Sequence, residues 1–461
     1  MKTRFTEYLP YYRRNLKVAF PVMLTQLGAS LVGLFDTIMV GHYATTDLAA
    51  VSFSNAIFFS VMVFSMGALM GLTPLIGVEV GAESVGGTDT EQHAHQVSYL
   101  YRSGLLFTLL LSGAMLVILG SCIPLLGCFG QEAVVVEAAR PYYILIVISI
   151  IPFLFFCMQK QFLEGLGNTM IAMVITMAMN LLNIALNWVF IFGKLGCPAM
   201  GATGAGIATL ISRTLMPVLF WIAIRAHKQW HKYINRAAWQ EDYHTGIRRL
   251  WKIGAPIGGQ TVIETILFTF SFIIIGWINK EALAAHHIAN QIADLTFMLA
   301  LGIGSATTIR VSHQLGKGDL HAVRMAANAS IHLVLVMNTI GAILMISLRN
   351  YIPWIFTKDE AVIPIASTLI MIAGFFQYAD GLQSVGAAML RGLTDVKRPM
   401  VYAFIAYIVV SLPLGLFLTF TCNLGAAGMW LSFIVSLSLA ALLFHTRFRK
   451  KLRHLEGKAD L

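Results

Sequence analysis

Acidic residues occur in the middle of long apolar segments of this sequence. Asp36 lies in LVGLFDTIMVGH, Glu264 in GGQTVIETILFTF and Asp380 in GFFQYADGLQS. A carboxylate deep in a membrane-spanning helix costs about 2.5–3.5 kcal/mol even on the mildest insertion scale, and such residues usually face a wet cavity and handle ions or protons. We therefore expect Asp36, and the pair Glu264 and Asp380, to bind a cation or carry a proton. The alternatives are a position near the helix end for Asp36 and structural pairing for the other two.

Three amide side chains share one face of a helix elsewhere in the chain. Asn180, Asn183 and Asn187 are spaced i, i+3 and i+7 in MAMNLLNIALNW. Amide oxygens are neutral ligands for a hard cation, and Asp36 is the carboxylate that we expect beside them. Asparagine also joins membrane helices by hydrogen bonds of about 0.6 kcal/mol each, so both interpretations stay open. Thr209 is a candidate hydroxyl ligand for the same site.

Other polar residues share helical faces with the second acidic pair. Gln260 lies one turn before Glu264, and Gln377 and Ser384 lie at i−3 and i+4 from Asp380. We expect these side chains to line a cavity. The remaining candidates for cavity lining are Asn180, Asn290, Asp294 and Tyr378.

The composition excludes a soluble enzyme and a nucleic-acid-binding protein. Hydrophobic residues make up 57% of the chain and charged residues 12%, with a mean hydropathy of +0.74, whereas soluble domains carry about 25% charged residues. The net charge of +10 is concentrated at the two ends and in alternate loops, as in membrane proteins. No basic stripe with interleaved aromatic residues is present, so we expect no nucleic acid partner. The five cysteines lack metal-site or disulfide spacing.

Twelve apolar segments are long enough to cross a bilayer, which takes about 20 residues. They run over 16–40, 50–77, 104–126, 141–162, 170–193, 203–226, 250–277, 284–309, 325–348, 361–389, 398–420 and 425–446. If the N-terminus is cytoplasmic, about 26 Lys and Arg residues fall in the inner segments and about 5 in the outer loops. The sequence therefore predicts an all-α, multi-pass protein of the inner (plasma) membrane with both termini in the cytoplasm. His286 and His287 are expected at the outer membrane interface.

The two halves of the sequence repeat each other. LAAVSFSNAI at 48–57 recurs as LAAHHIANQI at 283–292, and Lys17 and Pro21 recur at the same offset as Lys252 and Pro256. Each half has six spans, an even number, so the repeats are parallel and a binding cleft between them is expected. We predict two pseudo-symmetric six-helix lobes, an N-lobe at 1–226 and a C-lobe at 250–461, joined by a basic cytoplasmic linker at 227–249.

In its motifs the sequence resembles the multidrug and toxic compound extrusion (MATE) family, and most of all the bacterial NorM-type branch. LFDTIMVGH, NIALNWVFIFGKLG, LAAHHIANQI, IRVSHQLGKGD and MLRGLTDVKRPM occur in this order. The resemblance implies an antiporter, not an enzyme, that exports amphipathic cationic drugs in exchange for Na⁺ or H⁺ and needs no cofactor. We also expect a monomer in contact with membrane lipids.

The resemblance further assigns the ion sites. Asp36, Asn183 and Asn187, with Thr209 as a neighbour, match the N-lobe cation site of the family. Glu264 and Asp380 match the C-lobe pair of the NorM-type branch, which binds a cation or takes up a proton, so the coupling Na⁺ or H⁺ is expected at one group or the other.

Two positions depart from the family patterns. Phe376 stands four residues before Asp380, where NorM-type proteins often have a tyrosine, and Asn187 stands where another pattern has an acid. The first departure removes a hydroxyl from the C-lobe site, and the second lowers the charge of the N-lobe site. The alternative function is a flippase for lipid-linked precursors or polysaccharides in the same superfamily, although a pyrophosphate cavity should be strongly cationic and the intramembrane charges here are mostly acidic.

Overall fold

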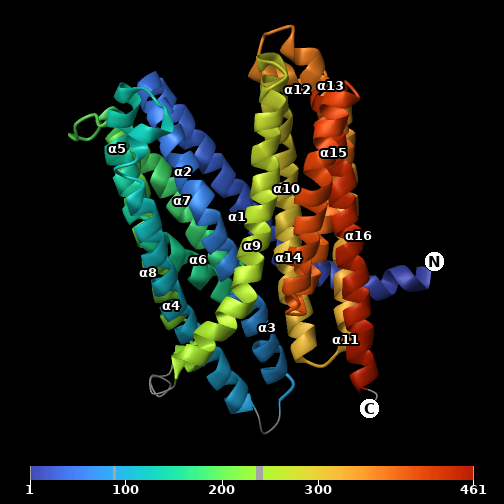
Figure 1. Ribbon diagram of the computed structural model, residues 1–461. Coiled ribbons are helices and arrows are strands. Elements are labelled where there is room, and N and C mark those ends of the chain that lie inside the picture. The colour runs from blue at the N-terminus through green and yellow to red at the C-terminus, as the bar shows by residue number, and fades with distance from the viewer. Residues whose placement is uncertain (1, 87–89, 235–241, 460–461) are drawn as a thin grey trace. The chain divides into compact units, whose positions relative to one another are not determined.

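The computed structural model describes residues 2–86, 90–234 and 242–459, and this part of the chain is almost entirely helical, without a β-strand (Figure 1). Twelve helical segments in it are long and apolar enough to cross a membrane. They are Glu7–Tyr43, Thr45–Glu83, Thr90–Ser121, Ala133–Gly165, Met170–Phe192, Gly201–Ala226, Tyr243–Gly276, Lys280–Gly316, Leu320–Leu348, Val362–Gly392, Lys397–Thr421 and Ala426–Gly457. Each overlaps one of the twelve ranges expected from the sequence, so the predicted all-α membrane fold is confirmed.

Contacts along the chain divide it into two compact units, whose boundaries fall inside helices α1 (Lys2–Tyr43) and α9 (Tyr243–Gly276). One is Leu24–Gly258, called here the 24–258 unit. The other combines Met1–Met23 with Gly259–Leu461 and is called the 259–461 unit. The lobes predicted at 1–226 and 250–461 stay a prediction, and residues 235–241 of the predicted linker lie outside the described residues.

The 24–258 unit contains seven further helices between the end of α1 and the start of α9. They are α2 (Thr45–Leu69), α3 (Leu72–Glu83), α4 (Thr90–Ser121), α5 (Ala133–Ile148), α6 (Ile150–Gly165), α7 (Met170–Phe192) and α8 (Gly201–Ala226), with short 3-10 turns at Leu126–Phe129 and His231–Ile234 (η2). Helix α8 packs against α5, α6 and α7, while α2 packs against α5. The start of α9 lies close to α2, because a Cβ atom at Gly254 would overlap the carbonyl oxygen of Ala68. Small residues permit this close approach of membrane helices.

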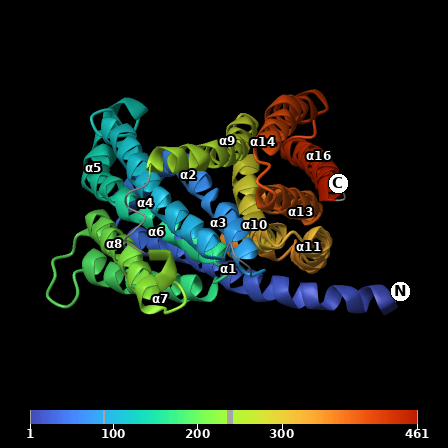
Figure 2. The same cartoon turned by 90° about the horizontal axis from the view of Figure 1, so that it is seen from below.

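The 259–461 unit is organised around α13 (Val362–Gly392). It also contains α10 (Lys280–Gly316), α11 (Leu320–Leu348), α12 (Ile352–Phe356), α14 (Lys397–Ala403), the π-helical segment η4 (Phe404–Ser411), α15 (Leu412–Leu416), a second π-helical segment η5 (Phe417–Thr421) and α16 (Ala426–Ala459). Helix α13 packs against α10, α11 and α16, and Figure 2 shows it lying among these three helices. Most of its side chains are therefore buried.

An aromatic cluster forms part of the core of this unit. The rings of Phe376, Trp430 and Phe433 lie within 5.3–6.1 Å of one another. His286 joins the cluster through a hydrogen bond of 3.0 Å from Trp430 Nε1 to its Nδ1, and its Nε2 lies 3.0 Å from the hydroxyl of Ser271. His286 is 0% exposed, and both of its ring nitrogens have partners inside the helix bundle. Its depth in the membrane, expected at the outer interface, stays a prediction.

Candidate cation sites

The first candidate site joins α1 and α7 within the 24–258 unit. The side-chain amide of Asn187 donates hydrogen bonds to Asp36 Oδ1 and, at 3.2 Å, to Asn183 Oδ1. Asn187 is 0% exposed, and Asn183 is also buried. The stripe of Asn183 and Asn187 therefore lies on a buried face of α7, as the spacing indicated, and Asn187 contacts Asp36 of α1.

One atom of this site lacks a hydrogen-bond donor. The side-chain amide oxygen of Asn187, Oδ1, is buried and accepts no hydrogen bond from any residue that the structure describes. Leaving such an acceptor unsatisfied costs about 1–3 kcal/mol. A monovalent cation beside the Asp36 carboxylate would satisfy it, because hard cations prefer carboxylate and amide oxygens.

The other two residues predicted for this site are less closely connected to it. Asn180 is buried near Gly28 of α1, where an added Cβ atom would lie 3.6 Å from its amide nitrogen. Thr209 on α8 is partly buried. Within the described ranges, no hydrogen bond links Thr209 to Asp36 or to the asparagines.

A basic residue of α8 lies in the same unit. Arg213 Nη1 donates to the hydroxyl of Ser149 at 2.8 Å, and its guanidinium lies 5.1 and 4.7 Å from the ring centres of Phe58 and Phe153. Ring faces stabilise a cation in this way. Arg213 interacts electrostatically with Asp36, but the two form no ion pair among the described residues.

The second candidate site joins α9, α13 and η4 within the 259–461 unit. Gln383 Nε2 donates to Glu264 Oε1 at 2.9 Å and to Asp380 Oδ1 at 3.2 Å. The hydroxyl of Tyr407 donates to the side-chain amide oxygen of Gln383, Oε1, at 2.9 Å. Asp380, Gln383 and Tyr407 are all at least 96% buried.

This arrangement fixes how Gln383 can act. An ionised carboxylate only accepts hydrogen bonds, so the amide nitrogen of Gln383 must face Glu264 and Asp380. The neutral amide of Gln383 thus supplies one hydrogen bond to each of the two acids and connects them. No described basic residue forms an ion pair with either acid. Asp294 is a third acid, and its negative charge repels that of Asp380. The group is suited to holding a proton or a cation.

Two predicted lining residues on α13 contact α11 instead of the acidic pair. Gln377 Nε2 donates to Gly374 O at 3.3 Å, and the Gln377 Oε1 lies beside Gly341 of α11. The hydroxyl of Tyr378 donates to Thr339 on α11 at 3.0 Å. The structure therefore does not bring these side chains to Glu264 and Asp380.

The remaining predicted lining residues are also not hydrogen-bonded to the pair. On α10, Asn290 Nδ2 donates to Asp294 Oδ2 at 3.3 Å, an interaction within one helix. Ser384 Oγ lies beside Gly304 of α10. Gln260 is buried and has no hydrogen bond to either acid in the described part of the chain.

Gln383 and Tyr407 are the residues that the sequence analysis missed. Gln383 lies three residues after Asp380, a spacing that places it on the same helical face, so the sequence contained a signal for it. Tyr407 lies in FIAYIVVS, a segment without other charged or amide residues, and nothing local indicated its role. Phe376 belongs to the aromatic cluster, and the hydroxyl of this site comes from Tyr407 on a different span.

Comparisons with known proteins identify the family. The MatE family model matches residues 21–189 and again 256–417. The two matches begin at Pro21 and Pro256, the prolines of the internal repeat.

Curated relatives match over nearly the whole chain. The multidrug resistance protein NorM of Photobacterium profundum is 31% identical over 441 residues, which is 95% of each chain. The multidrug resistance protein MdtK of Yersinia pseudotuberculosis is 31% identical over 448 residues, which is 96% of each chain.

Solved structures agree with the fold. A MATE protein crystallised in complex with MaL6 has a TM-score of 0.86 at 19% identity and covers 97% of both chains. A transporter of the MOP superfamily from Pyrococcus furiosus, described as having a binding pocket of reverse polarity, has a TM-score of 0.85 at 20% identity, also with 97% coverage of both chains. At these identities the structures show the fold alone. Together with the family match and the NorM relatives, they place this chain in the MatE family as a NorM-type MATE transporter.

Proposed function

We propose that this protein exports amphipathic organic cations from the cytoplasm in exchange for Na⁺ or H⁺. The similarity to proteins named for multidrug resistance supports the substrate class. The excess of Lys and Arg in alternate loops supports an inner-membrane location with both termini in the cytoplasm.

One observation carries the exchange mechanism. Asp36, Glu264 and Asp380 are held by amide donors, and none forms an ion pair with a basic side chain of the described chain. A carboxylate kept in a membrane without a basic side chain in direct contact is costly unless a mobile cation or proton neutralises it. Drug cations and coupling ions would then compete for the same negative charges.

Coupling requires that each ligand binds differently to two states of the transporter. We propose that lobes at 1–226 and 250–461 alternate between inward and outward access about the linker at 227–249. Binding of the cation from the outside shifts the equilibrium between the two states of the transporter and lowers the affinity of the transporter for the drug. The Asp36–Asn187 group offers oxygen ligands for Na⁺, and the Glu264–Asp380 group offers a proton site.

The amino acids around the two sites do not favour a flippase. A site for a lipid-linked pyrophosphate needs positive charge, whereas both groups are built on carboxylates. We therefore propose drug export and not lipid-precursor transport.

The proposal is tested by ethidium export from cells that produce Asp36→Asn, Glu264→Gln or Asp380→Asn, with Glu360→Gln as control. Glu360 is an exposed acid outside the predicted sites. We expect at least one of the three variants to lose export while the control retains it. Export at the wild-type rate by all three, at normal expression, would remove these carboxylates from the mechanism.

A further inference from the structure

A crevice of about 1400 Å³ lies in the 24–258 unit, between α4, α6, α8 and η2. Pockets for drug-sized ligands usually measure about 300–1,000 Å³, so this one is large for a drug. Much of its wall is apolar, including Leu105, Ile151, Phe155 and Val218. It is separate from the Asp36 group, since none of that group's residues line it.

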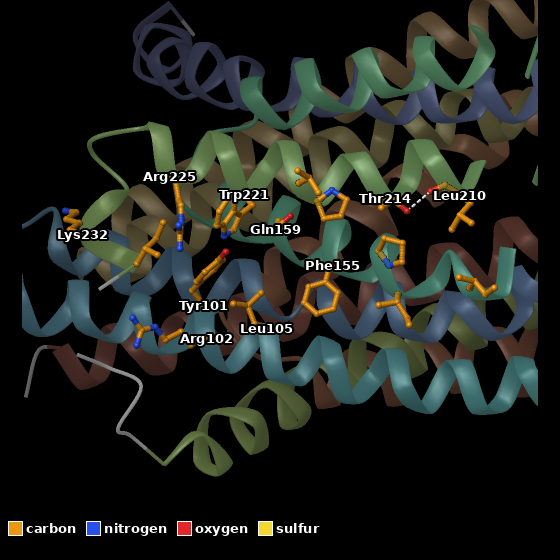
Figure 3. Close-up of a pocket in the computed structure, with 16 residues that line it drawn as sticks. Tyr101, Arg102, Leu105, Phe155, Gln159, Leu210, Thr214, Trp221, Arg225 and Lys232 are labelled. Atoms are coloured by element: carbon orange, nitrogen blue, oxygen red, sulfur yellow. Dashed lines mark hydrogen bonds between the residues drawn. The ribbon is translucent and has the colours of Figure 1, made fainter. Parts of the chain in front are cut away.

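The crevice is basic at one end. Arg102, Arg225 and Lys232 lie at the left end in Figure 3, while Phe155 and Leu210 lie farther along it. None of the sixteen described residues that line it is Asp or Glu. A cationic drug would therefore meet positive charge at this end and no acid among the described lining residues.

Two of the basic groups contact neighbouring side chains. The guanidinium of Arg225 lies 4.1 Å from the ring centre of Trp221 and is exposed. Lys232 pairs with Glu83, a carboxylate that also accepts a hydrogen bond of 2.7 Å from the Tyr233 hydroxyl. Glu83 compensates part of the charge of Lys232, so Arg225 is the stronger attraction for an anion.

We propose that this crevice binds an anionic phospholipid, with its phosphate at Arg225 and Lys232 and an acyl chain along the apolar wall of α4, α6 and α8. Basic pockets between membrane helices on the cytoplasmic side bind anionic headgroups. With the orientation proposed above, the basic end faces the cytoplasmic leaflet. The proposal uses that orientation but no step of antiport.

The test is native mass spectrometry of the purified full-length protein titrated with phosphatidylglycerol or, separately, phosphatidylcholine. We expect tighter binding of phosphatidylglycerol to the wild type. Arg225→Gln should weaken it about fivefold, and Arg225→Gln with Lys232→Gln about tenfold or more, because each basic residue near an anionic headgroup contributes an attraction of that size. The control is Arg453→Gln, an exposed arginine of α16 that should leave binding unchanged.

A second variant tests the crevice independently of charge. Val218 lines the crevice and is 46% exposed, so Val218→Trp should narrow it without disturbing the core. We expect this variant to lose both phospholipids while its thermal unfolding midpoint stays near that of the wild type.

Three results would overturn the proposal. They are equal binding of the two lipids by the wild type, unchanged phosphatidylglycerol binding in both the charge and the Val218→Trp variants, and displacement of the lipid by ethidium at stoichiometric amounts. None of them bears on whether export is driven by Na⁺ or H⁺, since the measurement uses no gradient.

Discussion

Gln383 is predicted to set the affinity for the coupling ion at the second site. Its amide nitrogen donates to both Glu264 and Asp380, and these hydrogen bonds stabilise the ionised, ion-free pair. Replacing it by methionine, which has a similar length, removes both donors. The ion-free state then loses stability, so a proton or Na⁺ should bind more tightly.

The size of the effect follows from the bonds removed. A hydrogen bond to a charged group contributes about 1.5–3 kcal/mol, and about 1.4 kcal/mol corresponds to a tenfold change in affinity. Loss of one such bond already predicts a fall of at least roughly tenfold in the half-saturating ion concentration. Release of a more tightly bound ion is slower, so the maximal drug flux should also fall.

The assay is drug flux in proteoliposomes at a series of ion concentrations. Gln377→Met is the matched control, because Gln377 is a buried glutamine of the same helix whose side chain contacts α11. Gln383→Met leaves the buried Tyr407 hydroxyl without its acceptor, which lowers the stability of the fold. Adding Tyr407→Phe removes this hydroxyl, and with it the loss of stability, but does not restore the hydrogen bonds that Gln383 donates to Glu264 and Asp380. A half-saturating concentration that is unchanged or higher in Gln383→Met, with the control behaving as wild type, would refute the reasoning.

Three further predictions concern stability. Asp47→Ala removes the acceptor for an amide at the start of α8, at 2.7 Å, and should lower the free energy of unfolding by about 1 kcal/mol without changing flux per folded molecule, as measured by thermal unfolding in detergent and by transport. Gly254→Val should cost about 1–3 kcal/mol or prevent folding, because its side chain overlaps Ala68; a normal yield of monodisperse protein would contradict this. His286→Leu leaves the indole N–H of Trp430 unpaired and should lower stability by about 1–3 kcal/mol, while the ion dependence of transport stays that of the wild type.

The membrane fold could be predicted from sequence because a bilayer imposes a minimum apolar length on each span. The twelve ranges follow from hydropathy alone, and the helices extend beyond many of them where polar residues continue the helix. The repeat was also visible in the sequence, because the matched segments and prolines recur at one constant offset. The two family matches start at these prolines.

The sites could be predicted only where neighbours lie on the same helix. The stripe of Asn183 and Asn187 follows from helical spacing, and the hydrogen bond between them is local. The hydrogen bond from Asn187 to Asp36 and that from Tyr407 to Gln383 join separate helices, and no periodicity reports such contacts. Tyr378 shares α13 with Asp380, but α11 packs against that helix and supplies the hydrogen-bond partner of Tyr378.

Drug flux under imposed gradients tests the central claim most directly. Purified protein in proteoliposomes receives a Na⁺ gradient and a pH gradient in separate experiments, and ethidium movement is followed in the wild type, Asp36→Asn and Asp380→Asn. The account predicts that flux against the drug gradient follows at least one ion gradient and that at least one variant abolishes this dependence. Wild-type flux that follows neither gradient would contradict cation exchange.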